Sequence, residues 1–89
     1  MKTEFRKSFS RDLKRRKRDN LFLNNVKEII EEVEKATNSD DIKNLKHLKG
    51  NSEFYRIRFG DYRIGVKIKG DIVIFIRALH RKDIYRYFP

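Results

Sequence analysis

Four arginines in the last third of the chain have the chemistry needed to bind a phosphodiester. Three of them alternate with apolar residues and the fourth follows shortly after: Arg56, Arg58, Arg63 and Arg81. A guanidinium donates paired hydrogen bonds to phosphate oxygens and can stabilise the charge that builds on them during displacement. The pattern therefore predicts a phosphate-handling surface, provided that the fold brings the four side chains to one face.

Proton transfer at such a surface requires a different residue type, because arginine stays protonated at neutral pH. His80 is the histidine near this face and is the candidate acid or base. His47 lies in a basic stretch upstream, and we interpret it as an ordinary surface or partly packed side chain. The carboxylates of this region fall in turns or beyond the strands, at Asp61, Asp71 and Asp83. We therefore predict no metal site and no cofactor.

The route that remains is attack by a ribose 2′-hydroxyl on its own phosphate, which restricts the substrate to RNA. Aromatic residues near the C-terminus could stack on an unpaired base and hold the scissile linkage in line: Tyr85, Tyr87 and Phe88. Tyr87 and Phe88 could equally close the bottom of a thin core. Composition and spacing thus indicate a basic, RNA-directed surface with a possible nuclease activity.

Three short antiparallel strands, over 54–59, 62–68 and 72–79, are expected to position these residues. Gly60-Asp61 has the composition of a type II′ turn, which makes Arg58 face Arg63 across the first hairpin. Like charges directly opposite each other are unfavourable, and a polyanionic ligand would remove this penalty.

For the second hairpin we predict a three-residue loop that pairs Ile68 with Ile72. This register turns Ile74 and Ile76 toward the core. It also brings Arg77 close to the predicted phosphate surface, near Arg63.

The first half of the chain supplies the elements that cover the sheet. We expect a strand over 2–6, a helix capped by Ser8, and an amphipathic helix capped by Asp19 or Asn20. Residues 42–48 are expected to form a short helix or turn. The prediction is a single α+β domain, residues 1–89, with an N-terminal strand and two helices packed on an antiparallel three- to four-stranded sheet whose other face is open.

Charge is concentrated at the two ends of the 89-residue chain. The formal net charge is +10, with nine basic and two acidic residues in 1–18 and nine basic and three acidic residues in 54–89. The segment between them is acidic. This asymmetry favours nucleic acid or an acidic protein as partner. The absence of cysteine and of a long apolar run predicts a soluble, cytoplasmic protein without membrane contact.

Four short motifs, taken in order along the chain, carry a family resemblance: Leu45-Lys46-His47-Leu48-Lys49-Gly50, Tyr55-Arg56-Ile57-Arg58, Gly60-Asp61-Tyr62-Arg63 and Arg77-Ala78-Leu79-His80-Arg81-Lys82-Asp83-Ile84-Tyr85. In order and spacing they resemble the RelE toxins of the RelE/ParE superfamily, especially archaeal-type members that end in a Tyr-x-Tyr-Phe-Pro tail. The resemblance implies a fold similar to microbial ribonucleases and a toxin that cleaves mRNA in the ribosomal decoding site.

The resemblance also implies roles for single residues. Arg56 and Arg58 match a basic pair that is usually lysine, Arg63 matches the central arginine, Arg81 the late arginine, and Tyr85 the C-terminal tyrosine. The basic groups of the family stabilise the transition state and help proton transfer, and the tyrosine stacks on the cleaved nucleotide. With arginine in place of both lysines, either His80 acts as the acid or the substrate and the ribosome supply the proton transfers.

The partners implied are the ribosome, its mRNA and a cognate RelB-like antitoxin whose extended segments wrap the toxin and neutralise its basic face. Two other functions stay open. A ParE-type toxin shares the fold but binds DNA gyrase and is no nuclease, and an inactive relative would bind RNA or its antitoxin alone.

Overall fold

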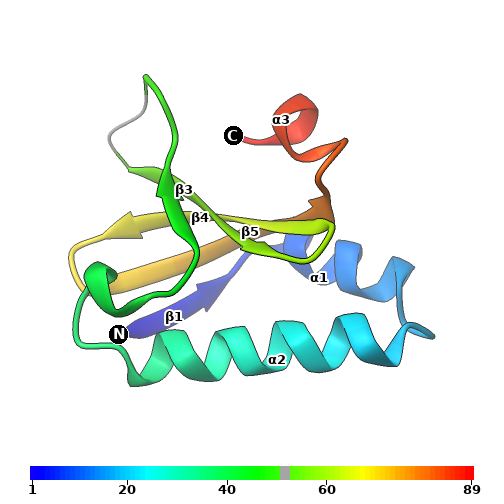
Figure 1. Ribbon diagram of the computed structural model, residues 1–89, viewed down its shortest axis with the longest axis horizontal. Helices are drawn as coiled ribbons and strands as arrows, with labels where there is room; N and C mark the ends of the chain where they lie inside the picture. Colours follow the sequence, from blue (N-terminus) through cyan, green and yellow to red (C-terminus); the bar gives the residue numbers. More distant parts are fainter. Residues whose placement is uncertain (51–52) are drawn as a thin grey trace.

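The computed structural model describes residues 1–50 and 53–89 as a five-stranded sheet with two long helices on one face and a short helix on the other (Figure 1). The elements are β1 (Lys2–Phe5), α1 (Lys7–Arg15), α2 (Asn20–Lys35), the 3-10 turn η1 (Ser39–Asp41), β2 (Leu45–His47), β3 (Phe54–Phe59), β4 (Tyr62–Lys69), β5 (Ile72–His80) and α3 (Ile84–Tyr87). The predicted α+β class is confirmed.

The sheet has five strands in the order β1-β5-β4-β3-β2 and is mixed, so the predicted antiparallel sheet of three to four strands is wrong in strand number and in the direction of β1. The N-terminal strand pairs with β5 in parallel, with Phe5 opposite Phe75, while the other pairs are antiparallel. Segment 42–48 contributes β2 at the edge, so the predicted short helix or turn there is wrong. Its three residues form a strand because β3 offers an open edge, which a local sequence pattern does not reveal.

The two helices begin at different kinds of cap. Asp19 caps α2 as predicted, since its carboxylate accepts a hydrogen bond from the backbone N–H of Phe22 at 3.0 Å. The predicted cap Ser8 lies inside α1, whose N-cap is Arg6. The Ser8 hydroxyl instead donates to the carbonyl oxygen of Ile76 at 2.6 Å. It therefore ties α1 to β5 rather than satisfying its own helix.

The register of the first hairpin is the predicted one. Phe59 lies opposite Tyr62 and Arg58 lies opposite Arg63. Gly60 has a positive φ of 56°, as the first central position of a type II′ turn requires. The local sequence of the turn is sufficient to set this register.

The predicted register of the second hairpin is wrong. The loop has two residues, so Lys69 pairs with Ile72 and Ile68 with Val73, and Gly70 takes the positive φ of 61° that closes it. A bulge then shifts the ladder between Gly65 and Val66. The strand consequently turns Val73 and Phe75 into the main core in place of Ile74 and Ile76, and Arg77 lies opposite Gly65 instead of near Arg63.

The main core lies between the sheet and α1 and α2. Its buried members include Phe9, Phe22, Val26, Val33, Ile57, Ile64, Val66, Val73 and Phe75. A second, smaller core lies where α3 meets the sheet and contains Leu48, Ile84 and Phe88. The opposite face of the sheet is therefore partly covered, and the expectation that it is open is wrong for that part. Within residues 1–50 and 53–89, no helix has the length and apolarity needed to cross a membrane.

Candidate functional site

Arg63 lies at the centre of a group of cationic side chains. Burial and the neighbouring positive charges of Arg56, Arg58 and Arg81 lower the pKa of the Arg63 guanidinium, whereas Tyr85 acts in the opposite direction. Arg58 and Arg63 are direct cross-strand partners in the β3–β4 hairpin. The fold thus brings the four predicted arginines and the predicted tyrosine close enough to influence one another. We refer to these four arginines as the arginine cluster.

Two of the three arginines from the hairpin, Arg56 and Arg63, are held by backbone carbonyl oxygens. Arg63 Nη1 donates to the carbonyl oxygens of Gly60, at 3.0 Å, and Tyr62, at 2.8 Å. Arg56 Nη1 donates to the carbonyl oxygen of Asn44 at 3.0 Å, and its buried Nε has no hydrogen-bond partner in the part of the chain that the structure describes. Neutral carbonyl oxygens orient the guanidinium groups without cancelling their charge.

Arg81 comes to the cluster from the turn after β5. Its backbone N–H donates to the carbonyl oxygen of Asp61 at 2.7 Å, which fixes the turn against the β3–β4 loop. Its Nε lies 3.8 Å from the Asp61 carboxylate, and both side chains are exposed. An exposed ion pair of this length contributes little, so Arg81 retains most of its capacity to bind another anion.

The charge of the cluster is otherwise uncompensated. Among residues 1–50 and 53–89, no carboxylate oxygen lies within 4 Å of the side-chain nitrogens of Arg56, Arg58 or Arg63. An uncompensated cluster of guanidinium groups can bind phosphate oxygens bidentately. The described residues, 1–50 and 53–89, also contain no group of three or more His, Cys, Asp or Glu side chains placed to bind a metal ion.

The C-terminal aromatic residues divide into two kinds. Tyr85 and Tyr87 are 61% and 54% exposed, whereas Phe88 is 3% exposed and packs in the smaller core. Tyr85 is therefore available to stack on a base, and Phe88 has the packing role that was the alternative interpretation for it. Tyr87 is exposed, and its ring lies 5.8 Å from the Arg77 guanidinium.

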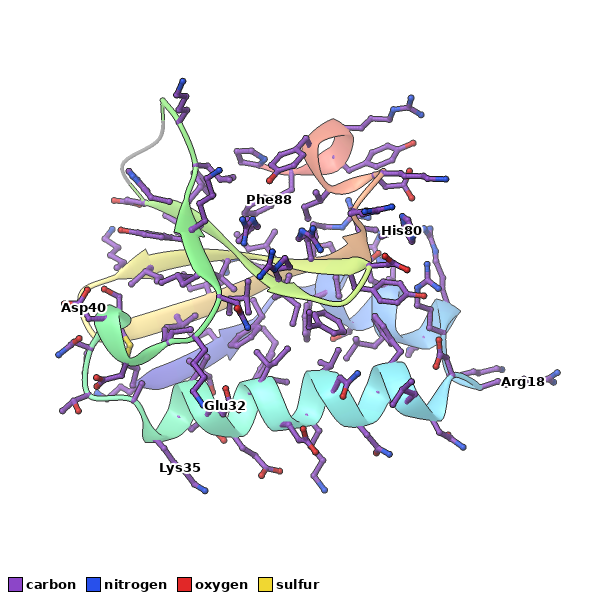
Figure 2. The ribbon with its side chains drawn as sticks, in the orientation of Figure 1. Arg18, Glu32, Lys35, Asp40, His80 and Phe88 are labelled. Carbon is purple, nitrogen blue, oxygen red and sulfur yellow. The ribbon has the colours of Figure 1, made fainter. Side chains whose placement is uncertain are left out.

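His80 is not brought together with the arginine cluster. It lies opposite Tyr62 in the β4–β5 ladder, so its side chain shares the face of Tyr62 and not that of Arg63, and the two rings meet edge to face at 5.7 Å. Its Nδ1 accepts a hydrogen bond from the backbone N–H of Lys82 at 3.1 Å. Figure 2 shows His80 where β5 leads into the chain toward α3. His47 is an exposed residue of β2 and lies against Tyr55, as expected of a surface side chain.

A buried ion pair beside the site was not predicted from the sequence. Asp12 on α1 is 3% exposed and accepts hydrogen bonds from Arg77 Nε at 2.8 Å and Nη2 at 3.0 Å. This pairing raises the pKa of Arg77, mainly through the hydrogen bond to the carboxylate. The available signal was the rarity of acids near the N-terminus, where Asp12 is one of two among nine basic residues.

Comparisons with known proteins agree with the fold. The chain matches the family model described as "ParE toxin of type II toxin-antitoxin system, parDE" over residues 3–85. It is 46% identical over 95 residues to Toxin RelE3 of Methanocaldococcus jannaschii, and the match covers 100% of both chains. It also resembles a chain in the crystal structure of the RelB-RelE antitoxin-toxin complex from Methanococcus jannaschii, with a TM-score of 0.79 and 45% identity, covering 97% of this chain and 99% of the other. The chain therefore belongs to the RelE/ParE superfamily of type II toxin-antitoxin toxins.

Proposed function

We propose that this protein is a RelE-type toxin that cleaves mRNA on the ribosome. The observation that carries the proposal is the position of Arg63, which lies among three further arginines and near the exposed Tyr85. Among residues 1–50 and 53–89, the one carboxylate paired with the cluster is Asp61, 3.8 Å from Arg81. Such a site is costly for the folded protein until an anion occupies it. Full-length similarity to Toxin RelE3 supports the same function.

The proposed reaction is an internal transesterification. The ribose 2′-oxygen loses its proton and attacks the phosphorus, the bond from phosphorus to the 5′-oxygen breaks, and that oxygen takes up a proton. The products are a 2′,3′-cyclic phosphate and a 5′-hydroxyl. The cluster stabilises the charge on the phosphate oxygens as the reaction proceeds, and Tyr85 stacks on the neighbouring base and holds the linkage in line.

Each arginine has a distinct part in this proposal. Arg56, Arg58 and Arg63, held by the sheet, bind the phosphate that is attacked. Arg81 lies on the more exposed turn and donates a hydrogen bond toward the departing 5′-oxygen. Because Arg63 lies among the other three arginines, we expect it to be the strongest single contributor.

We propose that the ribosome and the substrate supply the two proton transfers. His80 was the candidate acid, but its ring lies with Tyr62 and its Nδ1 already accepts a backbone hydrogen bond. His80→Gln is therefore expected to keep cleavage within a few-fold of the unmodified protein. If His80→Gln instead lost as much cleavage activity as an arginine variant, His80 would again be the candidate for proton transfer.

The proposed partner in the resting state is a RelB-like antitoxin, and the proposed location is the cytoplasm, where ribosomes and mRNA are found. The solved relative is an antitoxin-toxin complex, which supports a protein partner of this kind. An acidic, extended segment lying over the arginine cluster would neutralise it and block access of RNA.

Primer extension on a defined mRNA tests the proposal, with purified protein in the presence and absence of programmed ribosomes. We expect cuts within the decoding-site codon that depend on the ribosome and disappear in Arg63→Ala/Arg81→Ala. Circular dichroism of that variant establishes whether the fold is retained. Intact mRNA, combined with growth arrest by the same protein in cells, would overturn the nuclease proposal.

The second candidate function is inhibition of DNA gyrase, because the matching family model is named for ParE toxins. Gyrase inhibition makes no evident demand for a cluster of four arginines with an exposed tyrosine. A supercoiling assay with purified gyrase separates the two functions. Inhibition that survives Arg63→Ala/Arg81→Ala would favour the ParE type, and a protein inactive in both assays would be a binding-only relative.

A further inference from the structure

Asp12 is a buried carboxylate that the proposed cleavage does not use. Besides the two hydrogen bonds from Arg77, it accepts one from the backbone N–H of Ala78 at 2.9 Å. Three donors converge on one carboxylate, and the set joins α1 to β5 at the point where the strand has its bulge. The geometry fixes the direction in which the Arg77 guanidinium points.

The Arg77 guanidinium in turn contacts α3. Its central carbon lies 5.8 Å from the centroid of the Tyr87 ring, within the range of a cation–π interaction. Tyr87 is the last residue of α3 and lies two residues after Tyr85. The orientation of Arg77 therefore bears on the position of the helix that carries the proposed base-stacking residue.

A second contact to the C-terminal segment comes from the same cross-strand pair. Gly65 lies opposite Arg77 in the β4–β5 ladder, and the ring of Phe88 lies against it so closely that a β carbon at Gly65 would fall 2.6–2.7 Å from three ring atoms. Consecutive residues, Tyr87 and Phe88, thus rest on one pair of facing residues, Arg77 and Gly65. We call this pair the α3 seat.

The seat matters because α3 is too short to define its own position. It has four residues, and a single helical turn is not stable without tertiary contacts. Figure 1 shows α3 on the opposite side of the sheet from α2, reached by the chain that follows β5. Ile84 is buried at the start of α3, and the contacts at its C-terminal end, together with Ile84, decide where Tyr85 lies relative to the arginine cluster.

We propose that Asp12 is a positioning residue: by holding Arg77 in the α3 seat, it places Tyr85 against the arginine cluster. This inference rests on the proposed function, in which Tyr85 stacks on the cleaved nucleotide. A buried ion pair adds little net stability compared with apolar residues of the same volume, so a role in geometry accounts better for its presence than a role in stability.

The test uses variants that avoid a buried, unpaired charge. Asp12→Asn/Arg77→Gln replaces the ion pair by two neutral amides that can still hydrogen-bond, and Tyr87→Ala removes the exposed ring. Tyr87→Phe keeps the ring as a conservative variant. Glu32→Gln/Lys35→Gln is the matched control, because it also neutralises one acid and one base, both exposed on α2, where Figure 2 labels them far from α3.

The first readout is single-turnover cleavage of mRNA on programmed ribosomes. We expect Asp12→Asn/Arg77→Gln and Tyr87→Ala to lower the maximal rate about tenfold with half-saturation changed by less than about twofold, as loss of orientation alone would do. Tyr87→Phe and the control should match the unmodified protein. In a Tyr85→Ala background, Tyr87→Ala should have no further effect.

The second readout is hydrogen exchange of the Phe88 amide, which donates to the carbonyl oxygen of Ile84 at 2.8 Å. Exchange should be about fivefold faster in Asp12→Asn/Arg77→Gln and Tyr87→Ala, since loss of an exposed cation–π contact loosens α3 by that order. This measurement does not require nuclease activity. It therefore separates failure of the α3 seat from failure of the proposed function.

An unchanged cleavage rate in Asp12→Asn/Arg77→Gln would reduce Asp12 to a stabilising residue and overturn the proposal. The proposal would also be overturned if Tyr87→Ala lowered the cleavage rate equally in the presence of Tyr85 and in the Tyr85→Ala background. If the unmodified protein does not cleave mRNA, the proposed function fails, and exchange at Phe88 decides: unchanged exchange overturns the seat, and faster exchange supports it.

Discussion

Arg63 and Arg77 lie on neighbouring strands of one sheet and have opposite electrostatic surroundings. Arg77 forms a bidentate pair with the buried Asp12, which raises its pKa. Arg63 lies beside three cations and is partly buried, which lowers its pKa. The two side chains are chemically identical, so the difference comes entirely from what the fold places around each guanidinium.

Arg77 has its counter-charge within the fold, whereas Arg63 has no paired carboxylate among residues 1–50 and 53–89. Asp12 provides the counter-charge for Arg77 within the chain, and the pair connects α1 with β5. The counter-charge for Arg63 has to come from outside the chain. In the proposed function RNA supplies it, and an acidic antitoxin segment would take its place.

Arg63→Gln is expected to have the largest effect and to separate activity from stability. Loss of the central guanidinium should lower the rate of mRNA cleavage by at least about 100-fold, the usual cost of removing one donor to a developing oxyanion. The free energy of unfolding should rise by up to about 1 kcal/mol, because a like-charge contact is removed. Ribosome-dependent cleavage and thermal denaturation measure the two effects.

The sign of the stability change follows from the lowered pKa. A base whose pKa is lower in the folded than in the unfolded state is destabilised as a cation by folding. At neutral pH Arg63 is charged in both states, so the full penalty is present, and it would be relieved only as the pH rose through the lowered pKa. A melting temperature that falls in Arg63→Gln would contradict this account of the cluster.

Arg77→Met should have the opposite effect on stability to Arg63→Gln and lower the free energy of unfolding. It leaves the Asp12 carboxylate buried without its charged partner, at a cost of about 3 kcal/mol. The melting temperature of a domain of this size should then fall by more than about 10 °C. Urea denaturation gives the free energy, and Lys35→Met serves as a control on the exposed side of α2. Equal stability of the two variants would show that the ion pair is dispensable.

Gly65→Ala tests the α3 seat from its other side. The new β carbon would meet the Phe88 ring at 2.6–2.7 Å, so the ring and α3 must move, at a cost of about 1–3 kcal/mol. We expect greater exposure of Phe88 and weaker cleavage, because Tyr85 moves with α3. Gly70→Ala, which meets nothing within 4 Å, is the control for backbone strain alone. Unchanged hydrogen exchange of the Phe88 amide in Gly65→Ala would show that Gly65 is not part of the α3 seat.

The two arginine environments also differ in how far the sequence predicts them. The pairing of Arg58 with Arg63 follows from the local turn Gly60-Asp61 and was predicted correctly. The position of Arg77 depends on the bulge at Gly65/Val66, which adds a residue to one strand without a clear sequence signal. The second register was wrong already at its loop, which has two residues in place of the predicted three. Because a shift of one residue exchanges the faces of a strand, the predicted inward residues were wrong as well.

Long-range contacts account for the other features that the sequence did not reveal. Asp12 and Arg77 are 65 residues apart, and neither helical periodicity nor strand alternation indicates that they meet. His80 was expected beside the cluster as the histidine near this face, but it lies opposite Tyr62 in the ladder, and Tyr62 and its strand neighbour Arg63 point to opposite faces. The residue pattern itself grouped Arg81 with the three hairpin arginines and offered Tyr85, Tyr87 and Phe88 for base stacking, and resemblance to RelE toxins then selected Tyr85 among these three.

Replacing chloride by sulfate at constant ionic strength should give the smallest effect, and it sharpens the comparison without altering the fold. A divalent anion that binds the arginine cluster stabilises the folded state by mass action, and we expect the melting temperature to rise by about 2 °C. Sulfate also stabilises proteins generally by exclusion from their surface, so the increment has to be compared between variants. Asp12→Asn/Arg77→Gln should retain the full increment because its cluster is intact, whereas Arg63→Gln should retain only the general part. Equal increments in all three proteins would mean that the cluster does not bind the anion, and the counter-charge expected for Arg63 would then have to be sought in a protein surface rather than in phosphate.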